Sequence, residues 1–260
     1  LVGRGFSNIT VLADQFDNLT SHNAGGLFSP SFKVPDPQLI EDLGIESYIF
    51  YACIAKKEHP HLTGARIISA YFPTREDSDL EPFVGKVMAP GHEVILDFGN
   101  GTQKPMIAYD DGIFIDVGCL MREMRAFLNA SNVKFEQRHI SSFNEITANI
   151  IVNCTGLGAQ DLMDGERLMP VQGHLIMLKH QNPEELNYMI CASLGQDTTA
   201  DGFKMSRYFY FIPKTIPNAV PHEVGVIGGT FIKGAGHQTP HDEEFEQVIA
   251  QAKAFFGIND

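Results

Sequence analysis

The chain has 260 residues, enough for one large domain or two modest ones, with 43% hydrophobic and 20% charged residues. This composition is typical of a globular protein and excludes a wholly disordered chain. The net charge of −13 and the lack of any cluster of Lys and Arg argue against a nucleic-acid partner. No apolar run reaches the roughly 18 residues that a membrane span requires, and no charged-then-apolar leader is visible. We therefore expect a soluble, cytoplasmic protein with no membrane partner.

The first thirty residues combine a short strand with polar loops. Residues 9–12, Ile-Thr-Val-Leu, predict the strand, and Asp14 follows it directly. An acidic residue at such a place can hydrogen-bond the ribose of a dinucleotide, although an acid in a surface turn explains Asp14 equally well. Residues 20–30 form a glycine-rich loop that can offer hydroxyls and backbone N–H groups to a phosphate or a ring edge.

The middle of the chain mixes strand and helix signals. Short apolar runs at 48–53, 67–71 and 94–98 predict strands, and Asn100-Gly101 predicts a turn after the last of them. Residues 116–131 carry apolar side chains at i, i+4, i+7 and i+8, which predicts an amphipathic helix.

A second nucleotide-site signal lies at residues 150–158, Ile-Ile-Val-Asn-Cys-Thr-Gly-Leu-Gly. The run predicts a buried parallel strand that breaks at Asn153 and ends in a tight turn. In open α/β sheets, ligands bind beyond the carboxyl ends of such strands, where glycine lets the backbone approach closely. With the helix at 116–131 and a strand at 133–140, the alternation is typical of a parallel sheet.

The last hundred residues predict a different kind of sheet. Runs at 174–178, 208–212 and 224–231 are strand-like, with long polar connections that indicate antiparallel or mixed pairing. A helix should begin near Thr239-Pro240, because Thr239 can cap it and acids follow at 242–244.

Several of these segments, taken in order, resemble the D-amino-acid oxidase family of FAD-dependent oxidoreductases. Asn153-Cys154-Thr155-Gly156 is close to a motif of that family, and Tyr210-Phe211-Ile212-Pro213 is similar to one of its active-site strands. The ordered match covers most of the chain, with 31–110 matching poorly. The matching segments are 10–16, 19–27, 134–138 with 142–143, 151–156, 170–174, 210–213 and 228–231.

The resemblance implies an α/β fold with mixed α+β character, built from two interleaved parts. A Rossmann-like FAD-binding domain would take residues 1–30, 111–169 and 239–260. A substrate domain on a mixed sheet would take residues 31–110 and 170–238. Gly-x-Gly-x-x-Gly does not occur in the sequence, so the chain looks like a member that is incomplete at both ends.

The same resemblance implies a reaction and a set of site residues. An amino acid would pass its α-hydrogen to the flavin as hydride, the imino acid would hydrolyse, and O2 would reoxidise the flavin with release of H2O2. Tyr210 would bind the substrate carboxylate, and no metal is expected. The implied FAD contacts are Asp14, Gln15, Ser21, His22, Asn23, Gly25, Gly26, Leu27, Ile140, Thr155, Gly156, Gly228 and Gly229.

Departures from the family pattern leave alternatives open. A second tyrosine, expected four residues before Tyr210, is Ser206 here, with Tyr208 nearby. Arg207 is the nearest candidate for the carboxylate-binding arginine, and we read it as a surface charge. We expect the 260-residue chain to bind FAD poorly and to be nearly inactive alone. The alternatives are a non-catalytic scaffold or binding relative, or an oxidase of glycine, sarcosine or D-aspartate; a homodimer is left open.

Overall fold

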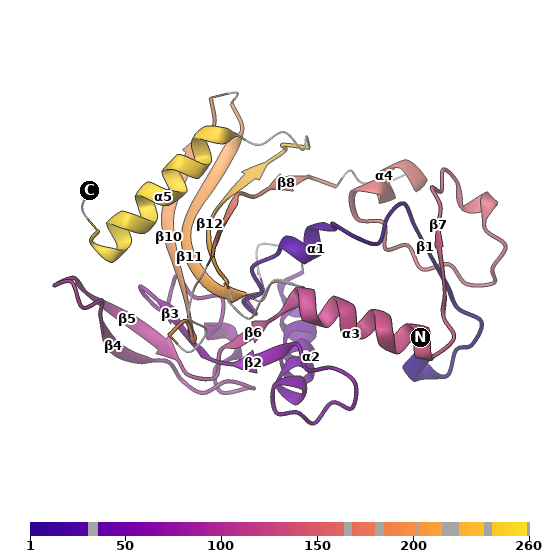
Figure 1. Cartoon of the computed structure of the whole chain (residues 1–260), viewed down its shortest axis with the longest axis horizontal. Coiled ribbons are helices and arrows are strands. Elements are labelled where there is room, and N and C mark those ends of the chain that lie inside the picture. The colour runs from indigo at the N-terminus through magenta and orange to yellow at the C-terminus, as the bar shows by residue number, and fades with distance from the viewer. Residues whose placement is uncertain are drawn as a thin grey trace.

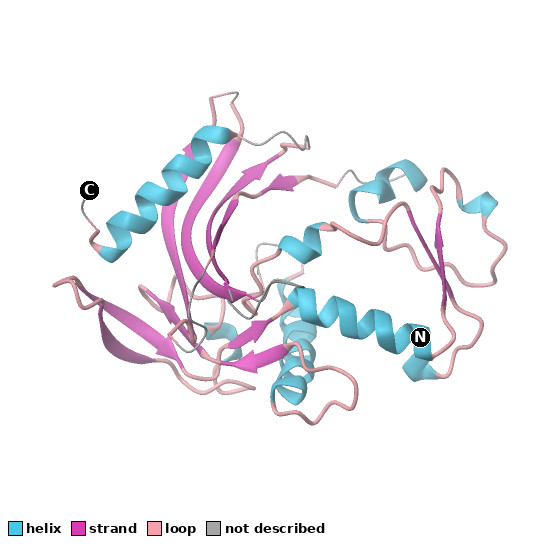
Figure 2. Cartoon of the chain, in the orientation of Figure 1, coloured by secondary structure: helices cyan, strands magenta, loops and turns pink. Residues whose placement is uncertain are grey.

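A mixed sheet of eight strands dominates the computed structural model, which describes residues 1–30, 36–163, 168–179, 185–200, 202–214, 224–236 and 241–258 (Figures 1 and 2). The strand order is β4-β5-β3-β10-β11-β12-β8, and β9 also pairs with β12. Only the β3–β10 pair among them is parallel. The strands are β3 (Ser69–Phe72), β4 (His92–Asp97), β5 (Gln103–Tyr109), β8 (Val171–Gln172), β9 (Leu175–Leu178), β10 (Tyr188–Thr198), β11 (Lys204–Lys214) and β12 (Val224–Lys233).

This sheet confirms the mixed pairing predicted for the last hundred residues and the α/β fold class. β4 and β5 pair antiparallel on either side of the predicted turn at Asn100-Gly101. The runs at 174–178, 208–212 and 224–231 lie within or next to β9, β11 and β12. In the described part of the chain, no helix is long and apolar enough to cross a membrane.

Helix α5 (Asp242–Phe256) covers one face of β10, β11 and β12 (Figure 1). The Phe255 ring stacks on Phe209 of β11, with ring centroids 4.3 Å apart. The terminal helix is thus confirmed, while its predicted cap Thr239 and Pro240 lie outside the described residues. The apolar stripe of α5 packs against this face of the sheet.

Helix α2 (Pro37–Ala55) contradicts the strand predicted at 48–53. Asp36 caps it by accepting a hydrogen bond from the Leu39 N–H (3.0 Å), and Pro37 occupies the first turn. Tyr48 and Ala52 are buried four residues apart, so the apolar run follows a helical period. The helix packs against β2 (Ala65–Ile67) and β6 (Ile113–Ile115), which pair antiparallel.

A smaller region lies at the other end of the molecule, where β1 (Thr10–Ala13) and β7 (Lys134–Gln137) form a parallel pair (Figure 1). Between them in sequence, α3 (Val117–Ala130) begins at Asp116, whose carboxylate accepts from the Cys119 N–H (2.9 Å). All three confirm predicted elements. The short helices are α1 (Thr20–Asn23), α4 (Ala159–Leu162) and the 3-10 turns η1 (Val2–Arg4), η2 (Glu81–Phe83), η3 (Phe143–Glu145) and η4 (Gly156–Gly158).

The buried strand predicted at 150–153 does not form. Ile150 and Val152 are 62% and 59% exposed, and the segment has no regular structure. A strand requires a hydrogen-bonded neighbour, and within the described residues β1 and β7 pair only with each other. The run at 150–153 pairs with neither of them, and its apolar side chains stay exposed.

Candidate functional site

The carboxyl ends of β1 and β7 bring three polar side chains together. Because parallel strands end at the same edge, Asp14 after β1 meets Gln137 and His139 at the end of β7. The Asp14 Oδ1 lies 2.9 Å from His139 Nδ1, and Gln137 Nε2 donates to the Asp14 carbonyl oxygen at 2.8 Å. Asp14 and the adjacent Gln15 are exposed. A carboxylate held in this way can accept hydrogen bonds from the hydroxyls of a ribose.

Helix α1 carries three of the predicted cofactor residues in a single turn. The His22 Nδ1 accepts a hydrogen bond from the Leu19 N–H (3.0 Å), so this ring closes its own helix. In the neutral ring the proton then resides on Nε2. Ser21 and Asn23 are exposed and can offer polar groups to a ligand.

Residues 25–27 join α1 to the sheet through backbone contacts. Leu27 forms an antiparallel bridge with Phe114 of β6, and the Ile115 N–H donates to the Gly26 carbonyl oxygen. Gly26 has a φ of +99°, and a Cβ there would overlap the Ile115 carbonyl oxygen. Only glycine can occupy this position, so Gly26 allows the loop to lie directly on β6.

Tyr210 of β11 is the centre of a second group. A Cβ at Gly228 would overlap the Tyr210 ring, and one at Gly229 would lie 2.7 Å from its hydroxyl oxygen. A Cβ at Gly25 would lie 3.9 Å from the same ring, on the side of the α1 loop. Burial raises the pKa of Tyr210 above its ordinary value, with the Cys191 thiol adding to the effect. The hydroxyl therefore stays protonated and can donate a hydrogen bond.

The structure thus gathers Gly25, Tyr210, Gly228 and Gly229, and separately gathers Asp14 with the end of β7. The other predicted residues are more local. The Thr155 N–H and hydroxyl both donate to the Asn153 Oδ1 (3.2 and 2.7 Å) in an exposed turn. Among the described residues, no atom lies within 4 Å of a Cβ built on Gly156. Ile140 is half-buried just after β7.

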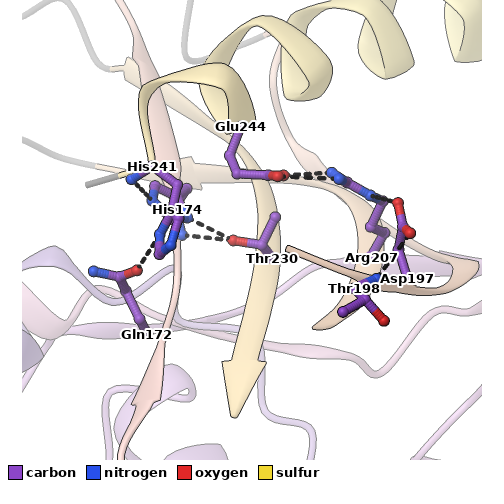
Figure 3. Close-up of polar contacts among 8 residues, drawn as sticks. All are labelled: Gln172, His174, Asp197, Thr198, Arg207, Thr230, His241 and Glu244. Carbon is purple, nitrogen blue, oxygen red and sulfur yellow. Dashed lines mark hydrogen bonds and ion pairs between the residues drawn. The ribbon is translucent and has the colours of Figure 1, made fainter. Parts of the chain in front are cut away.

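Arg207 is not the surface charge that the sequence predicts. Its guanidinium faces α5, where Nη1 and Nη2 donate to the Glu244 carboxylate at 2.5 and 3.1 Å, and Nε lies 3.4 Å from Asp197 (Figure 3). The Arg207 and Glu244 side chains are 14% and 4% exposed. Tyr210 contacts Gly25 on the opposite face of the sheet. Arg207 therefore helps to dock α5 and is occupied by carboxylates.

A histidine pair lies beside this ion pair (Figure 3). The buried His174 lies with its Nδ1 2.7 Å from the Thr230 Oγ1, and its Nε2 accepts from the His241 N–H at 3.1 Å. Since Nε2 accepts, Nδ1 carries the proton and donates to Thr230. Burial lowers the pKa of His174, which keeps the ring neutral. The His174 carbonyl oxygen lies 2.7 Å from the place of a Cβ on Gly229.

Sequence reasoning missed Lys214, at the end of β11. The residue is 3% exposed, and its Nζ donates to the carbonyl oxygens of His22 and Ala24 at 2.8 Å each. A Lys after Ile212-Pro213 carries no signal of this contact, because its partners lie 190 and 192 residues away in the chain. The only indication in the sequence is that Lys214 stands four residues after Tyr210, a spacing that places both side chains on the same face of a strand.

These groups fit parts of FAD, the cofactor that the resemblance implies. Asp14 suits the ribose at the adenosine end. The missing side chains at Gly228 and Gly229 let the Tyr210 ring lie directly on their backbone. The usual pyrophosphate cradle, Gly-x-Gly-x-x-Gly, is absent from the 260 residues.

Known proteins share this fold and sequence pattern. D-amino-acid oxidase from Streptomyces coelicolor is 23% identical over 92% of this chain and 67% of its own length. D-amino-acid oxidase from Dictyostelium discoideum is 24% identical over 65% of the chain, which spans about half (49%) of that relative. The solved structure of glycine oxidase from Bacillus cereus superposes with a TM-score of 0.65 at 15% identity, covering 97% of this chain and 74% of the other.

Another solved structure, of NikD, an unusual amino acid oxidase, superposes with a TM-score of 0.60 at 14% identity, over 92% of this chain and 68% of that one. At such low identity the two superpositions establish the fold alone. The family model described as FAD dependent oxidoreductase (DAO) matches residues 1–259. The chain therefore belongs to the DAO family of FAD-dependent oxidoreductases.

Proposed function

We propose that this protein oxidises an amino acid with FAD as its cofactor. The observation that carries the proposal is the position of Tyr210, whose ring lies between Gly25 and the Gly228-Gly229 backbone. A protonated phenol between two side-chain-free backbone segments can bind a carboxylate beside a planar ring. The family assignment and the two D-amino-acid oxidase relatives support the same reaction.

FAD, when bound, accepts the hydride from the substrate and passes the electrons to O2, which yields H2O2. The protein's share of the work is orientation. The Tyr210 hydroxyl would donate a hydrogen bond to the substrate carboxylate, and the Asp14 carboxylate would accept from the ribose. Ser21, Asn23 and the backbone of 25–27 would contact the phosphates and the ring, and the imino acid would hydrolyse after release.

We further propose a division into a cofactor part (1–30 and 111–169) and a substrate part (31–110 and 170–238). The packing of α5 on β10–β12 supports adding residues 242–256 to the substrate part. We also propose a cytoplasmic location, which cell fractionation tests. We propose a homodimer as well, which light scattering after gel filtration tests.

The proposed reaction is tested on the protein with any residues that its gene encodes on either side of these 260. Its absorbance spectrum is recorded, and peroxide release is measured against a panel of D- and L-amino acids with glycine and sarcosine included. We expect a flavin spectrum that bleaches anaerobically with at least one D-amino acid. A bound flavin that no member of the panel bleaches contradicts amino-acid oxidation.

The role of Tyr210 is tested by Tyr210→Phe, with Tyr188→Phe as the matched control. Tyr188 lies on β10 and packs on Phe211 in the cluster under α5, away from Gly25. Loss of one hydrogen bond to a charged group should raise KM about tenfold. Equal kinetics for the two variants contradict the assignment.

The 260-residue chain by itself should bind FAD weakly, because the helix start that usually anchors the pyrophosphate is absent from its sequence. The purified chain, mixed with excess FAD and desalted, should retain little flavin absorbance. A yellow protein with nearly stoichiometric flavin contradicts this expectation.

The substrate stays open among D-amino acids, glycine, sarcosine and D-aspartate. One observation favours a non-catalytic relative instead: Arg207, the arginine nearest to Tyr210 in the sequence, is bound to Glu244, and Ser206 stands where a second tyrosine is expected. Such a relative would bind flavin and release no peroxide with any member of the panel.

A further inference from the structure

Lys214 connects β11, the strand that carries Tyr210, to the end of α1. In β11 every second side chain lies on the same face of the sheet, so Tyr210, Ile212 and Lys214 share one face. The Ile212 and Tyr210 side chains meet Gly25, where an added Cβ would lie 2.9 Å from Ile212 Cδ1. The Lys214 Nζ reaches the carbonyl oxygens of His22 and Ala24, both 2.8 Å away. One ammonium thus fixes the residues that come directly before Gly25.

The two carbonyls suit this contact for a local reason. They lie at the end of the one-turn helix α1, where carbonyl oxygens have no intrahelical N–H partner. The Ala24 N–H donates to Ser21, which leaves the His22 and Ala24 oxygens for a donor from outside the helix. A lysine ammonium has three N–H donors and can serve both oxygens at once.

Burying this ammonium has a cost that packing alone does not explain. Burial lowers the pKa of Lys214, and the charge of Asp116 opposes the shift only in part. A methionine of similar length would fill the same space without desolvating a charge. The specific gain from lysine is the placement of the 22–24 backbone relative to β11.

We propose that Lys214 is a positioning residue. It holds segment 22–25 against Tyr210 and so sets the distance between this segment and β11 in the proposed site. Its kinetic consequence rests on the proposed amino-acid oxidation. The contact of Lys214 with the two carbonyls does not depend on that reaction, so the contact and the proposed oxidation can fail separately. A misplacement of about 1 Å at a reacting centre can lower a rate about 100-fold.

The first test needs no cofactor and uses the 260-residue chain. Amide hydrogen exchange is compared for wild type, Lys214→Met, Lys214→Arg and Lys204→Met. Lys204 is the exposed residue at the start of β11 and serves as the matched control. We expect peptides covering 19–28 to exchange about tenfold faster in Lys214→Met, with the β4–β5 hairpin unchanged. Lys214→Arg, which can still donate to both carbonyls, should restore most of the protection.

The second test uses the protein with bound FAD. In Lys214→Met we expect kcat to fall about 10- to 100-fold with KM changed little, and Lys214→Arg to recover part of the loss. Unchanged exchange at 19–28 in Lys214→Met overturns the contact. Faster exchange with an unchanged kcat overturns its positioning role. If no variant, wild type included, oxidises any substrate, the proposed function fails while the exchange data still decide the contact.

Discussion

Phe209 of β11 is 1% exposed and stacks on Phe255, whereas Ile150 and Val152, in the segment after β7, are 62% and 59% exposed. The sheet that carries Tyr210 is thus defined by tight side-chain packing. The β1–β7 end that carries Asp14 is held by four residues of strand pairing, a few polar contacts and the Phe16–Phe135 ring contact beneath the Arg125 guanidinium. Substitutions in the sheet should therefore change the free energy of unfolding, and substitutions at the strand pair should change ligand affinity.

The strongest test of this comparison is Phe209→Ala. Removing a fully buried ring that contacts Phe255 and Phe256 should lower the free energy of unfolding by about 3–5 kcal/mol. Ile150→Ala, at the exposed segment, should change it by less than about 0.5 kcal/mol. Urea denaturation measures both. Similar losses for the two variants would mean that the regions do not differ in packing.

A smaller loss is expected when the docking of α5 is weakened. Glu244→Gln leaves the Arg207 guanidinium half-buried with only the exposed Asp197 as a charged partner. We expect a loss of about 2–3 kcal/mol, below the range for a fully buried pair because Asp197 remains. Glu243→Gln, in the same helix turn but exposed, is the control. A control as destabilised as Glu244→Gln would assign the effect to the helix dipole.

At the strand pair the expected change is in affinity. Asp14→Asn should weaken FAD binding about tenfold, since it would replace the charged acceptor that we propose for the ribose by a neutral one. Its urea midpoint should stay at the wild-type value. Titration of flavin fluorescence measures the affinity, with Asp17→Asn in the same loop as the control. A shifted midpoint with unchanged affinity would make Asp14 a structural residue through His139.

The smallest effect is a pH dependence at Lys214. Its folded pKa lies below the ordinary 10.5, so between these two values the unfolded chain binds more protons than the folded one. The difference in free energy of unfolding between wild type and Lys214→Met should therefore increase as the pH rises between these two pKa values. It should decrease again as the pH is lowered. Urea midpoints of both proteins at several alkaline pH values measure it. A constant difference would show that burial does not perturb the ammonium.

Elements whose signals are local could be predicted. The strand before Asp14, the helix at 116–131 and the terminal helix follow from the apolar pattern of residues that lie within a few positions of each other. The run at 48–53 could not, because a short apolar run fits strand and helix alike, and the Asp36-Pro37 start that decides the matter lies a dozen residues earlier.

For the site, the sequence by itself determined the family and the residues that could serve it, since glycine and tyrosine at fixed places in ordered motifs carry that information. Only the tertiary structure decided which charges meet. It joined Arg207 to Glu244 and Lys214 to the carbonyls beside Gly25, and it left Ile150 and Val152 without a partner strand. Local sequence records which face an element buries, whereas these contacts join segments far apart in the chain, and their geometry exists only after the chain has packed.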